Sequence, residues 1–245
     1  MTICVGVIGG TGFYELCGVH RSKTVKTIFG NVTVTIGDIE GREVVFLPRH
    51  GRSHDIPPHA INYEANMTAL KQLGVRAVIG VNAVGALKPA LCVGDYVIPN
   101  QFIDFTKSRH TVFASGVRHV DMRQPYCEEL RTLLREALQG TRCHAHGTYV
   151  CVEGPRFETE AELRMFTLLG GDVIGMTSVP EAVIARELAM CYATFSLVTN
   201  EVSRTGTSHD EIVRFFASRA REIECITHDV IRHIALNFTC NCLKD

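Results

Sequence analysis

The chain has 245 residues, of which 46% are hydrophobic and 21% are charged, and its formal net charge is −1. This composition is typical of a globular protein with a large buried core, and the length fits a single α/β domain over residues 1–245. A charge near zero disfavours nucleic acid and anionic membranes as partners, no apolar segment reaches the roughly 18 residues of a membrane span, and no secretory signal pattern begins the chain, so we expect a cytoplasmic protein.

Five short apolar runs predict buried strands, at residues 3–8, 44–47, 77–81, 173–174 and 193–198. Proline, glycine and capping-box signals at segment ends predict the helices. In chain order these are residues 59–73, 127–139, a helix from the capping box at 159–162 to about 170, a helix from 180 to 189, and one long terminal helix from the capping box at 208–211. The order predicts an α/β fold, a single domain with a twisted mixed central β-sheet flanked by helices.

Small or polar residues follow each predicted strand, and ligands of open α/β sheets bind beyond the carboxyl ends of the strands. Gly9-Gly10-Thr11-Gly12 can direct several N–H groups and a hydroxyl at one anion. Arg49-His50-Gly51 follows the second run, and a planar guanidinium suits bidentate phosphate contact. Asn82-Ala83 and Thr177 follow the third and fourth runs. These residues form a phosphate site if the strand ends are neighbours.

The glycine-rich start is also similar to a dinucleotide-binding turn. Such a turn leads directly into a helix, and an acidic residue ends the next strand. Residues 13–23 show no helical period, and the next strand-like run reaches Asp38 without a helical crossover. We therefore favour phosphate binding over a nicotinamide cofactor, with a purely structural tight turn as the other alternative.

The ten cysteines show no C-x-x-C pair and no zinc-like spacing. His144-Ala145-His146 has no carboxylate or thiol at ligand spacing, so we predict no metal site. We expect most cysteines to be small buried side chains. Cys240-Asn241-Cys242 lies in a polar terminus, where a thiol redox pair and a fraying end are the two alternatives.

Four motifs resemble, in order, those of the trimeric purine nucleoside phosphorylase and methylthioadenosine phosphorylase family. They are RHGRSH at 49–54, NAVG at 82–85, EGPRFET at 153–159 and GMTSVPE at 175–181. The resemblance extends from residue 7 to the terminal helix. It implies a homotrimer or a dimer of trimers and no metal or organic cofactor. A nucleoside and inorganic phosphate, as co-substrate, would be its small-molecule partners.

The resemblance also assigns roles to individual residues. Phosphate would be held by Thr11, Arg49, His50, Asn82, Ala83 and Thr177. The nucleoside would be bound by His54, Phe157 stacked on the purine, Met176 against the ribose, Val202, and His209 near the ribose 5′-hydroxyl. His119 would reach across a subunit interface into the neighbouring active site.

Asn200 and Glu158 bear on the base. The methylthioadenosine branch usually has aspartate at positions 200 and 202 and tends to have serine at 158, whereas Asn200 and Glu158 resemble the inosine and guanosine enzymes. A 6-oxopurine presents the O6 acceptor and the N1–H donor, which an amide NH₂ and a carboxylate satisfy. Adenine presents the reverse pattern and would leave buried groups unpaired.

The resemblance implies reversible phosphorolysis, in which phosphate attacks C1′ and releases the base and ribose 1-phosphate. Asn200 would stabilise negative charge on the base, Glu158 would accept from N1–H, and His50 would orient phosphate. A methylthioinosine or methylthioadenosine phosphorylase is the alternative substrate assignment. A nucleoside-binding module without turnover and an oxidoreductase are alternatives of other classes.

Overall fold

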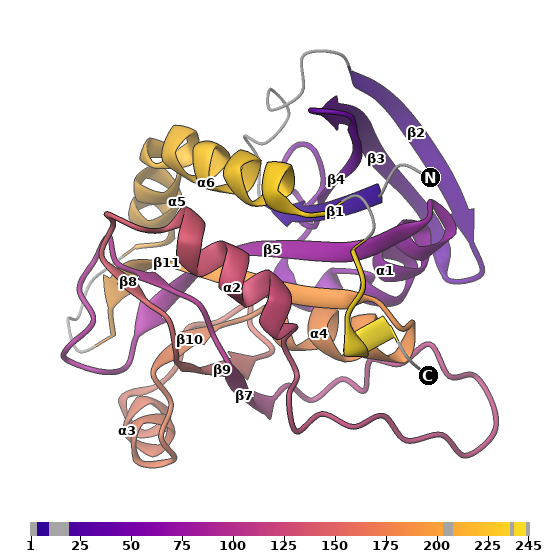
Figure 1. The fold of residues 1–245 in the computed structure, drawn as a ribbon. Coiled ribbons are helices and arrows are strands. Elements are labelled where there is room, and N and C mark those ends of the chain that lie inside the picture. Colours follow the sequence, from indigo (N-terminus) through magenta and orange to yellow (C-terminus); the bar gives the residue numbers. More distant parts are fainter. Residues whose placement is uncertain (1–3, 10–19, 203–207, 236–237, 244–245) are drawn as a thin grey trace.

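The computed structural model describes residues 4–9, 20–202, 208–235 and 238–243. Within these residues, eleven strands form one mixed sheet (Figure 1). The strands are β1 (Cys4–Gly9), β2 (His20–Thr27), β3 (Gly30–Ile39), β4 (Arg42–Pro48), β5 (Val75–Ala86), β6 (Tyr96–Val97), β7 (Gln101–Phe105), β8 (Cys143–His144), β9 (Thr148–Val152), β10 (Val173–Gly175) and β11 (Cys191–Glu201). The main path runs β2-β3-β4-β1-β5-β10-β9-β7, while β11 joins β5 to β6, and β6 pairs with β8.

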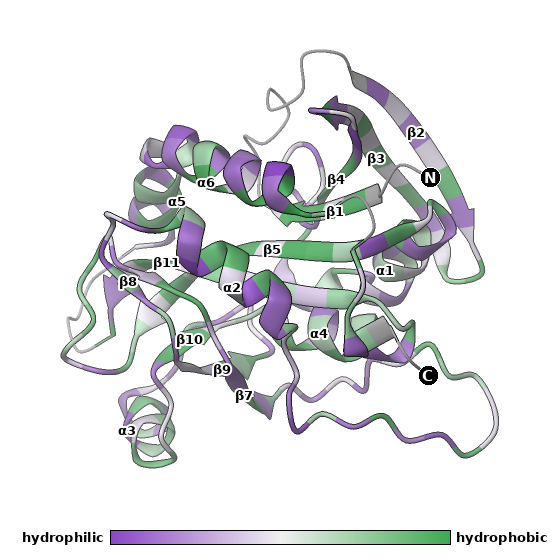
Figure 2. Cartoon of the chain, viewed as in Figure 1, coloured by the Kyte–Doolittle hydropathy of each residue, from purple (hydrophilic) through white to green (hydrophobic). Residues whose placement is uncertain are grey.

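Helices cover both faces of this sheet (Figure 1). They are η2 (Pro58–Ala60), α1 (Tyr63–Gln72), α2 (Glu128–Ala137), α3 (Glu160–Leu168), α4 (Ser178–Glu187), α5 (His209–Ser218), α6 (Ala220–His233) and η3 (Asn241–Leu243). The apolar sides of α2 and α6 share one core with β1, β5 and β11, and α1 and α4 share a second core on the opposite face. Figure 2 shows the corresponding contrast between apolar central strands and polar outer helix faces. None of the helices in the described residues is both long and apolar enough to cross a membrane.

The pairing of β5, the central strand, changes partway along its length. Its first half pairs in parallel with β1, as far as Ile8 opposite Gly80, and its last two residues pair with antiparallel β10. Its other edge pairs with β11. Among the described residues, 81–84 therefore have a strand neighbour on one edge only. Open α/β sheets bind ligands at such switch points.

The predicted mixed sheet with flanking helices is confirmed, but most of the predicted strands are longer than their apolar runs, β5 and β11 by the most. β5 and β11 continue through Asn82, Ala83 and Asn200, which were expected after the strands. The prediction failed because polar residues inside buried strands were taken as strand ends. Their polar atoms are satisfied within the sheet, as described below.

The helix boundaries differ in two places. The first helix begins at Tyr63, where the Asn62 side chain caps it, because the two prolines start only the short η2. The prediction of one long terminal helix is wrong, because α5 and α6 are separate helices that meet at Arg219. Both capping boxes are formed as predicted, at Thr159 and Ser208.

Candidate active site

One cavity of about 650 Å³ lies at the switch point of β5. This volume is typical of a site for a small organic ligand. Its walls come from the turn after β4, from β5, β10 and β11, from residues 155–158, and from α5. Twelve of the predicted site residues line it: Arg49, His50, His54, Asn82, Ala83, Phe157, Glu158, Met176, Thr177, Asn200, Val202 and His209. Four of the five segments predicted to converge on one site therefore do so. Most of the fifth, the glycine-rich segment at residues 9–12, lies outside the described residues.

Arg49 is buried and forms an ion pair with the equally buried Glu181. Its Nε and Nη2 donate to the two carboxylate oxygens of Glu181 at 2.6 and 3.1 Å, and Nη1 donates to the carbonyl of Val81 at 2.6 Å. Burial lowers the pKa of Arg49, but attraction and hydrogen bonds from Glu181 outweigh it and hold the pKa above its ordinary value. The bidentate edge of Arg49 is thus directed at Glu181, and one Nη1 hydrogen is left for a ligand.

Asn82 and Thr177 form a polar pair on the same wall. Ser196 and Thr194 donate to Oδ1 of Asn82 at 2.8 and 3.0 Å, which directs the amide Nδ2 to the Thr177 hydroxyl at 3.4 Å. Thr177 is the residue before α4, and its side chain makes no capping hydrogen bond. The free N–H groups of a helix N-terminus favour an anion. The pair therefore offers neutral donors to a phosphate.

His50 is neutral at neutral pH. Burial, and then the nearby Arg49, lower the pKa of His50 to about 4. Its Nδ1 lies 2.9 Å from the carbonyl of Ile56, which cannot donate, so Nδ1 carries the proton and Nε2 is an acceptor. The ring can therefore accept a hydrogen bond from a protonated phosphate oxygen, which orients the anion.

A bulge in β11 places Asn200 at the cavity. The pairing with β5 shifts between Val198 and Asn200, so Thr199 is an extra residue in the strand. Bulges re-aim side chains next to active sites. The Thr199 hydroxyl lies 3.1 Å from Oδ1 of Asn200, and donation there leaves the amide NH₂ for a ligand.

Glu158 and Phe157 lie on the segment between β9 and α3. Burial raises the pKa of Glu158, although the side chain still lines the open cavity. Phe157 is 51% exposed, which suits a ring that awaits a stacking partner. Both residues border the same space as Asn200 and Met176.

α5 closes the cavity with apolar side chains. Ile212, Val213 and Phe216 line it, and the described side chains of α5 are not buried in the protein core. Phe215 of the same helix packs against the core instead, and Phe216 contacts both the core and the cavity. His209, on the first turn of α5, contributes to lowering the pKa of His54, after burial.

Two predicted residues are not part of this cavity as described. Thr11 lies outside the described residues. His119 is exposed on the long connection between β7 and α2, which projects at the lower right of Figure 1. It was predicted to serve a neighbouring subunit, and that assignment stays a prediction.

Sequence reasoning missed three residues that support the site: Glu181, Tyr192 and Thr199. Tyr192 donates to Glu181 at 2.6 Å and so helps to hold the partner of Arg49. Glu181 ends the motif at 175–181, but the motif alone did not indicate its role. For Tyr192, the sequence signal was the alternation of hydroxyl residues in an otherwise apolar strand, at Thr194 and Ser196. Such alternation indicates that one face of the strand supports buried polar groups.

Fold and cavity together define an α/β protein with a cavity at the switch point of its sheet. In this cavity, hydrogen-bond donors that suit an anion lie beside amide and carboxylate groups that suit a flat polar ring. Residues 5–232 match the model of the phosphorylase superfamily. The chain belongs to this superfamily, which confirms the resemblance seen in the four motifs.

Several relatives cover nearly the whole chain. A 6-oxopurine nucleoside phosphorylase of Pyrococcus furiosus is 45% identical over 253 residues, which cover 97% of this chain and 96% of the relative. An S-methyl-5′-thioadenosine phosphorylase of Pyrococcus abyssi is 44% identical and covers 97% of this chain and 95% of its own. The crystal structure of a methylthioadenosine phosphorylase from an antarctic soil metagenomic library matches with a TM-score of 0.92 at 36% identity, over 99% of this chain and 90% of that one.

Proposed function

We propose that the protein is a purine nucleoside phosphorylase that acts on 6-oxopurine nucleosides such as inosine and guanosine. The observation that carries the proposal is the single cavity that Arg49 and Asn200 share. Relatives named 6-oxopurine nucleoside phosphorylase, at 45% identity, agree with it. Inorganic phosphate is the co-substrate.

Phosphate binds against the wall formed by Arg49, His50, Asn82 and Thr177. Ala83 adds a backbone N–H: the carbonyl of Val81 faces Arg49, and in an extended strand the residue two positions on faces the same edge. Thr11 belongs to the same proposed set. Asn82, Thr177 and the N–H of Ala83 are neutral donors. Arg49 is charged, but its charge is balanced by Glu181.

The base lies against the opposite wall. Asn200 donates to O6 or N7, where negative charge develops as the glycosidic bond breaks, and Glu158 accepts from N1–H. Phe157 stacks on the purine and Met176 contacts the ribose. An amide fixed before the reaction stabilises developing charge without reorganising during it.

The reaction needs no nucleophile from the protein. Phosphate attacks C1′, the N-glycosidic bond breaks, and its electron pair passes to the purine. The phosphate anion also stabilises positive charge on the ribose ring. Catalysis therefore comes from positioning and electrostatics, with His50 as an orienting acceptor rather than a proton donor.

A second candidate substrate is a 5′-methylthio nucleoside. The apolar side chains of Ile212 and Val213 on α5, next to His209, would suit a methylthio group better than a hydroxyl. Relatives named S-methyl-5′-thioinosine and S-methyl-5′-thioadenosine phosphorylase, at 44% identity, agree with this alternative. The proposal also includes a cytoplasmic homotrimer or dimer of trimers.

The test is release of free base from inosine, guanosine, adenosine and their 5′-methylthio analogues, each with and without phosphate. We expect phosphate-dependent release, with the highest kcat/KM for inosine or guanosine. Release that does not depend on phosphate would contradict phosphorolysis. A higher kcat/KM for a methylthio substrate would instead select the second candidate.

A further inference from the structure

Four cysteines from three distant parts of the chain meet at one point, away from the cavity. Cys127 immediately precedes α2, Cys191 is the first residue of β11, and Cys240 and Cys242 flank the start of η3. Their four Sγ atoms all lie within 4.8 Å of one another. Cys127 Sγ and Cys240 Sγ are 3.4 Å apart. We call this group the cysteine cluster.

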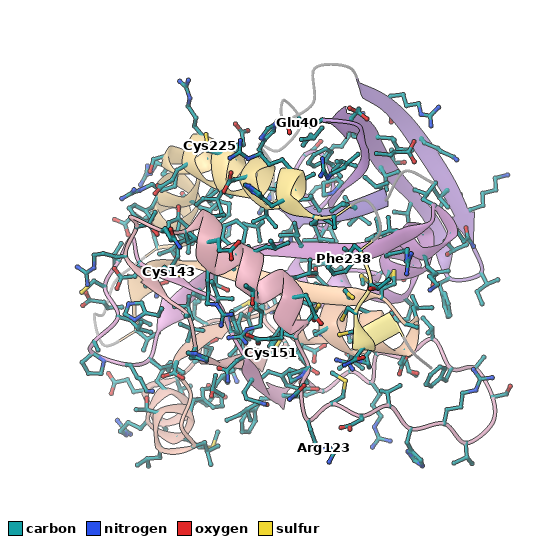
Figure 3. All side chains as sticks on the ribbon, viewed as in Figure 1. Glu40, Arg123, Cys143, Cys151, Cys225 and Phe238 are labelled. Carbon is teal, nitrogen blue, oxygen red and sulfur yellow. The ribbon has the colours of Figure 1, made fainter. Side chains whose placement is uncertain are left out.

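The backbone around the cysteine cluster is held in place. The N–H of Cys127 donates to the carbonyl of Tyr192 at 2.8 Å, which joins the start of α2 to the start of β11. The N–H of Cys242 donates to Sγ of Cys240 at 3.2 Å. Cys127, Cys191 and Cys240 are buried in the core between the sheet, α2 and α6, and Cys242 packs against it. The described terminal residues 238–243 are therefore not a frayed polar end. In Figure 3, Cys240 and Cys242 can be located by following the chain onwards from the labelled Phe238.

The spacing of the sulfur atoms fits one chemistry well. A tetrahedral Zn²⁺ site with Zn–S bonds of about 2.3 Å places its sulfurs about 3.8 Å apart. The cluster's limit of 4.8 Å and its 3.4 Å contact bracket that value. Four sulfurs without a carboxylate or imidazole in the group favour a soft tetrahedral ion over Mg²⁺ or Ca²⁺.

We propose that Cys127, Cys191, Cys240 and Cys242 together bind one Zn²⁺ ion in a closed structural site. Binding replaces the thiol protons, which pass to the solvent, and involves no change of oxidation state. The excess negative charge of a four-thiolate site is offset in part by the N-terminus of α2, which begins directly after Cys127. The Cys127 thiol now donates to the exposed Glu129, which can turn to solvent when that proton is lost.

The site's role would be to hold the chain together rather than to catalyse. Cys191 and Asn200 lie at opposite ends of β11, about 30 Å apart at the usual rise of a strand. An ion at the cysteine cluster connects α2, β11 and the C-terminal segment. The sequence analysis singled out Cys240 and Cys242 but did not predict a metal site, because the spacing of the four cysteines follows no known zinc pattern.

The test is an anaerobic titration of the reduced, metal-free full-length chain with Co²⁺. We expect one equivalent to bind, with the visible bands of tetrahedral cobalt and a thiolate charge-transfer band, and one equivalent of Zn²⁺ to abolish these bands. Cys242→Ser should weaken binding by more than about 100-fold, the upper range for losing a residue that only supports a ligand. Cys225→Ser, an exposed cysteine on α6, is the matched control and should bind as the parent does.

Three results would overturn the proposal. The reduced chain could show no tetrahedral cobalt spectrum, or Cys225→Ser could lose binding as fully as Cys242→Ser. Alternatively, mass spectrometry of the chain as purified could show it lighter by two or four hydrogens and free of zinc, which would mean that the cluster holds one or two disulfides instead of a metal ion. If Cys242→Ser does not fold, the intensity of the parent's charge-transfer band still counts the thiolate ligands, and fewer than four would contradict the site. None of these outcomes depends on phosphorolysis.

Discussion

At the scale of single residues, the two asparagines in the cavity, Asn82 and Asn200, are oriented in the same way. In each, a neighbouring hydroxyl donates to the amide oxygen, from Ser196 to Asn82 at 2.8 Å and from Thr199 to Asn200 at 3.1 Å. Each amide therefore turns its NH₂ group to the ligand. In the function that we propose, these NH₂ groups donate to phosphate on one wall and to the acceptor atoms of the base on the other.

Replacing Asn200 should separate catalysis from binding. We expect Asn200→Ala to lower kcat for inosine by roughly 10²-fold or more, since one charge-stabilising donor is lost. Asn200→Asp should shift the ratio of kcat/KM values towards adenosine, because a carboxylate accepts from an amino group. Steady-state kinetics on both nucleosides measures this. An unchanged kcat for Asn200→Ala would remove Asn200 from catalysis, and an unchanged ratio for Asn200→Asp would refute our account of base selection.

His50 should make stability depend on pH. Because the folded chain holds the pKa of His50 at about 4, below its ordinary value of 6.5, the unfolded chain binds more protons between these values. The stabilising contribution is complete above pH 6.5 and is lost as the pH falls towards 4, at no more than about 1.4 kcal/mol per pH unit. In thermal unfolding without phosphate, the Tm of His50→Asn should therefore fall less steeply than the parent's over this interval. His59→Asn, at an exposed position, is the control, and parallel curves for His50→Asn and the parent would contradict the prediction.

At the scale of elements, the site depends on how β5 and β11 meet. The bulge at Thr199 sets Asn200 opposite Gly85 of β5. A Cβ atom at Gly85 would lie 2.7 Å from Cγ1 of Val202 and 3.2 Å from Nδ2 of Asn200. The absence of a side chain at this position thus leaves room for the amide.

We expect Gly85→Ala to displace Asn200 and lower kcat/KM for inosine by about 10²-fold, the cost of a misplacement of about 1 Å. The double variant Gly85→Ala/Val202→Ala removes the closest clash and should recover part of the loss. The measurement is kcat/KM for inosine in both variants, with circular dichroism to check that each one folds. Equal losses in the single and double variants would show that crowding by Val202 is not the cause.

The sequence predicted the sheet, both capping boxes and the residues that line the cavity, because apolar runs and motifs are local signals. It did not predict the pairing of Arg49 with Glu181, 132 residues away, nor the meeting of Cys127 with Cys240. These contacts depend on the order of strands in the sheet. The break at Arg219 was missed because apolar residues repeat at helical spacing on both sides of it.

At the scale of the whole molecule, the long connection of residues 106–127 is fixed at its ends and exposed in its middle. His110 pairs with Glu64 of α1 at 3.0 Å, Glu187 of α4 accepts from the N–H of Val112 at 2.8 Å, and Arg186 donates to the carbonyl of Gln124 at 2.6 Å. Val117, between these anchors, is 88% exposed. The middle of the connection is therefore available to another subunit.

If His119 serves a neighbouring site, mixed oligomers should recover activity. We expect His119→Ala and Asn200→Ala, each impaired alone, to exceed the sum of their separate rates when coexpressed, since some sites then combine intact residues from two chains. Light scattering should give the mass of three or six chains. Mixtures of Val117→Ala with Asn200→Ala are the control, and strictly additive rates from assembled mixed oligomers would place His119 outside the active site.

Thr199 has a consequence for how sharply the enzyme can choose its base. Its hydroxyl has one proton and two acceptors in reach, Oδ1 of Asn200 at 3.1 Å and the carbonyl of Val84 at 3.3 Å. If the hydroxyl donates to the carbonyl of Val84 instead, its oxygen can accept a hydrogen bond from the Asn200 amide, and Asn200 would then turn its carbonyl towards the ligand. The preference for an oxo base that we propose therefore depends on which of these two acceptors the Thr199 hydroxyl donates to.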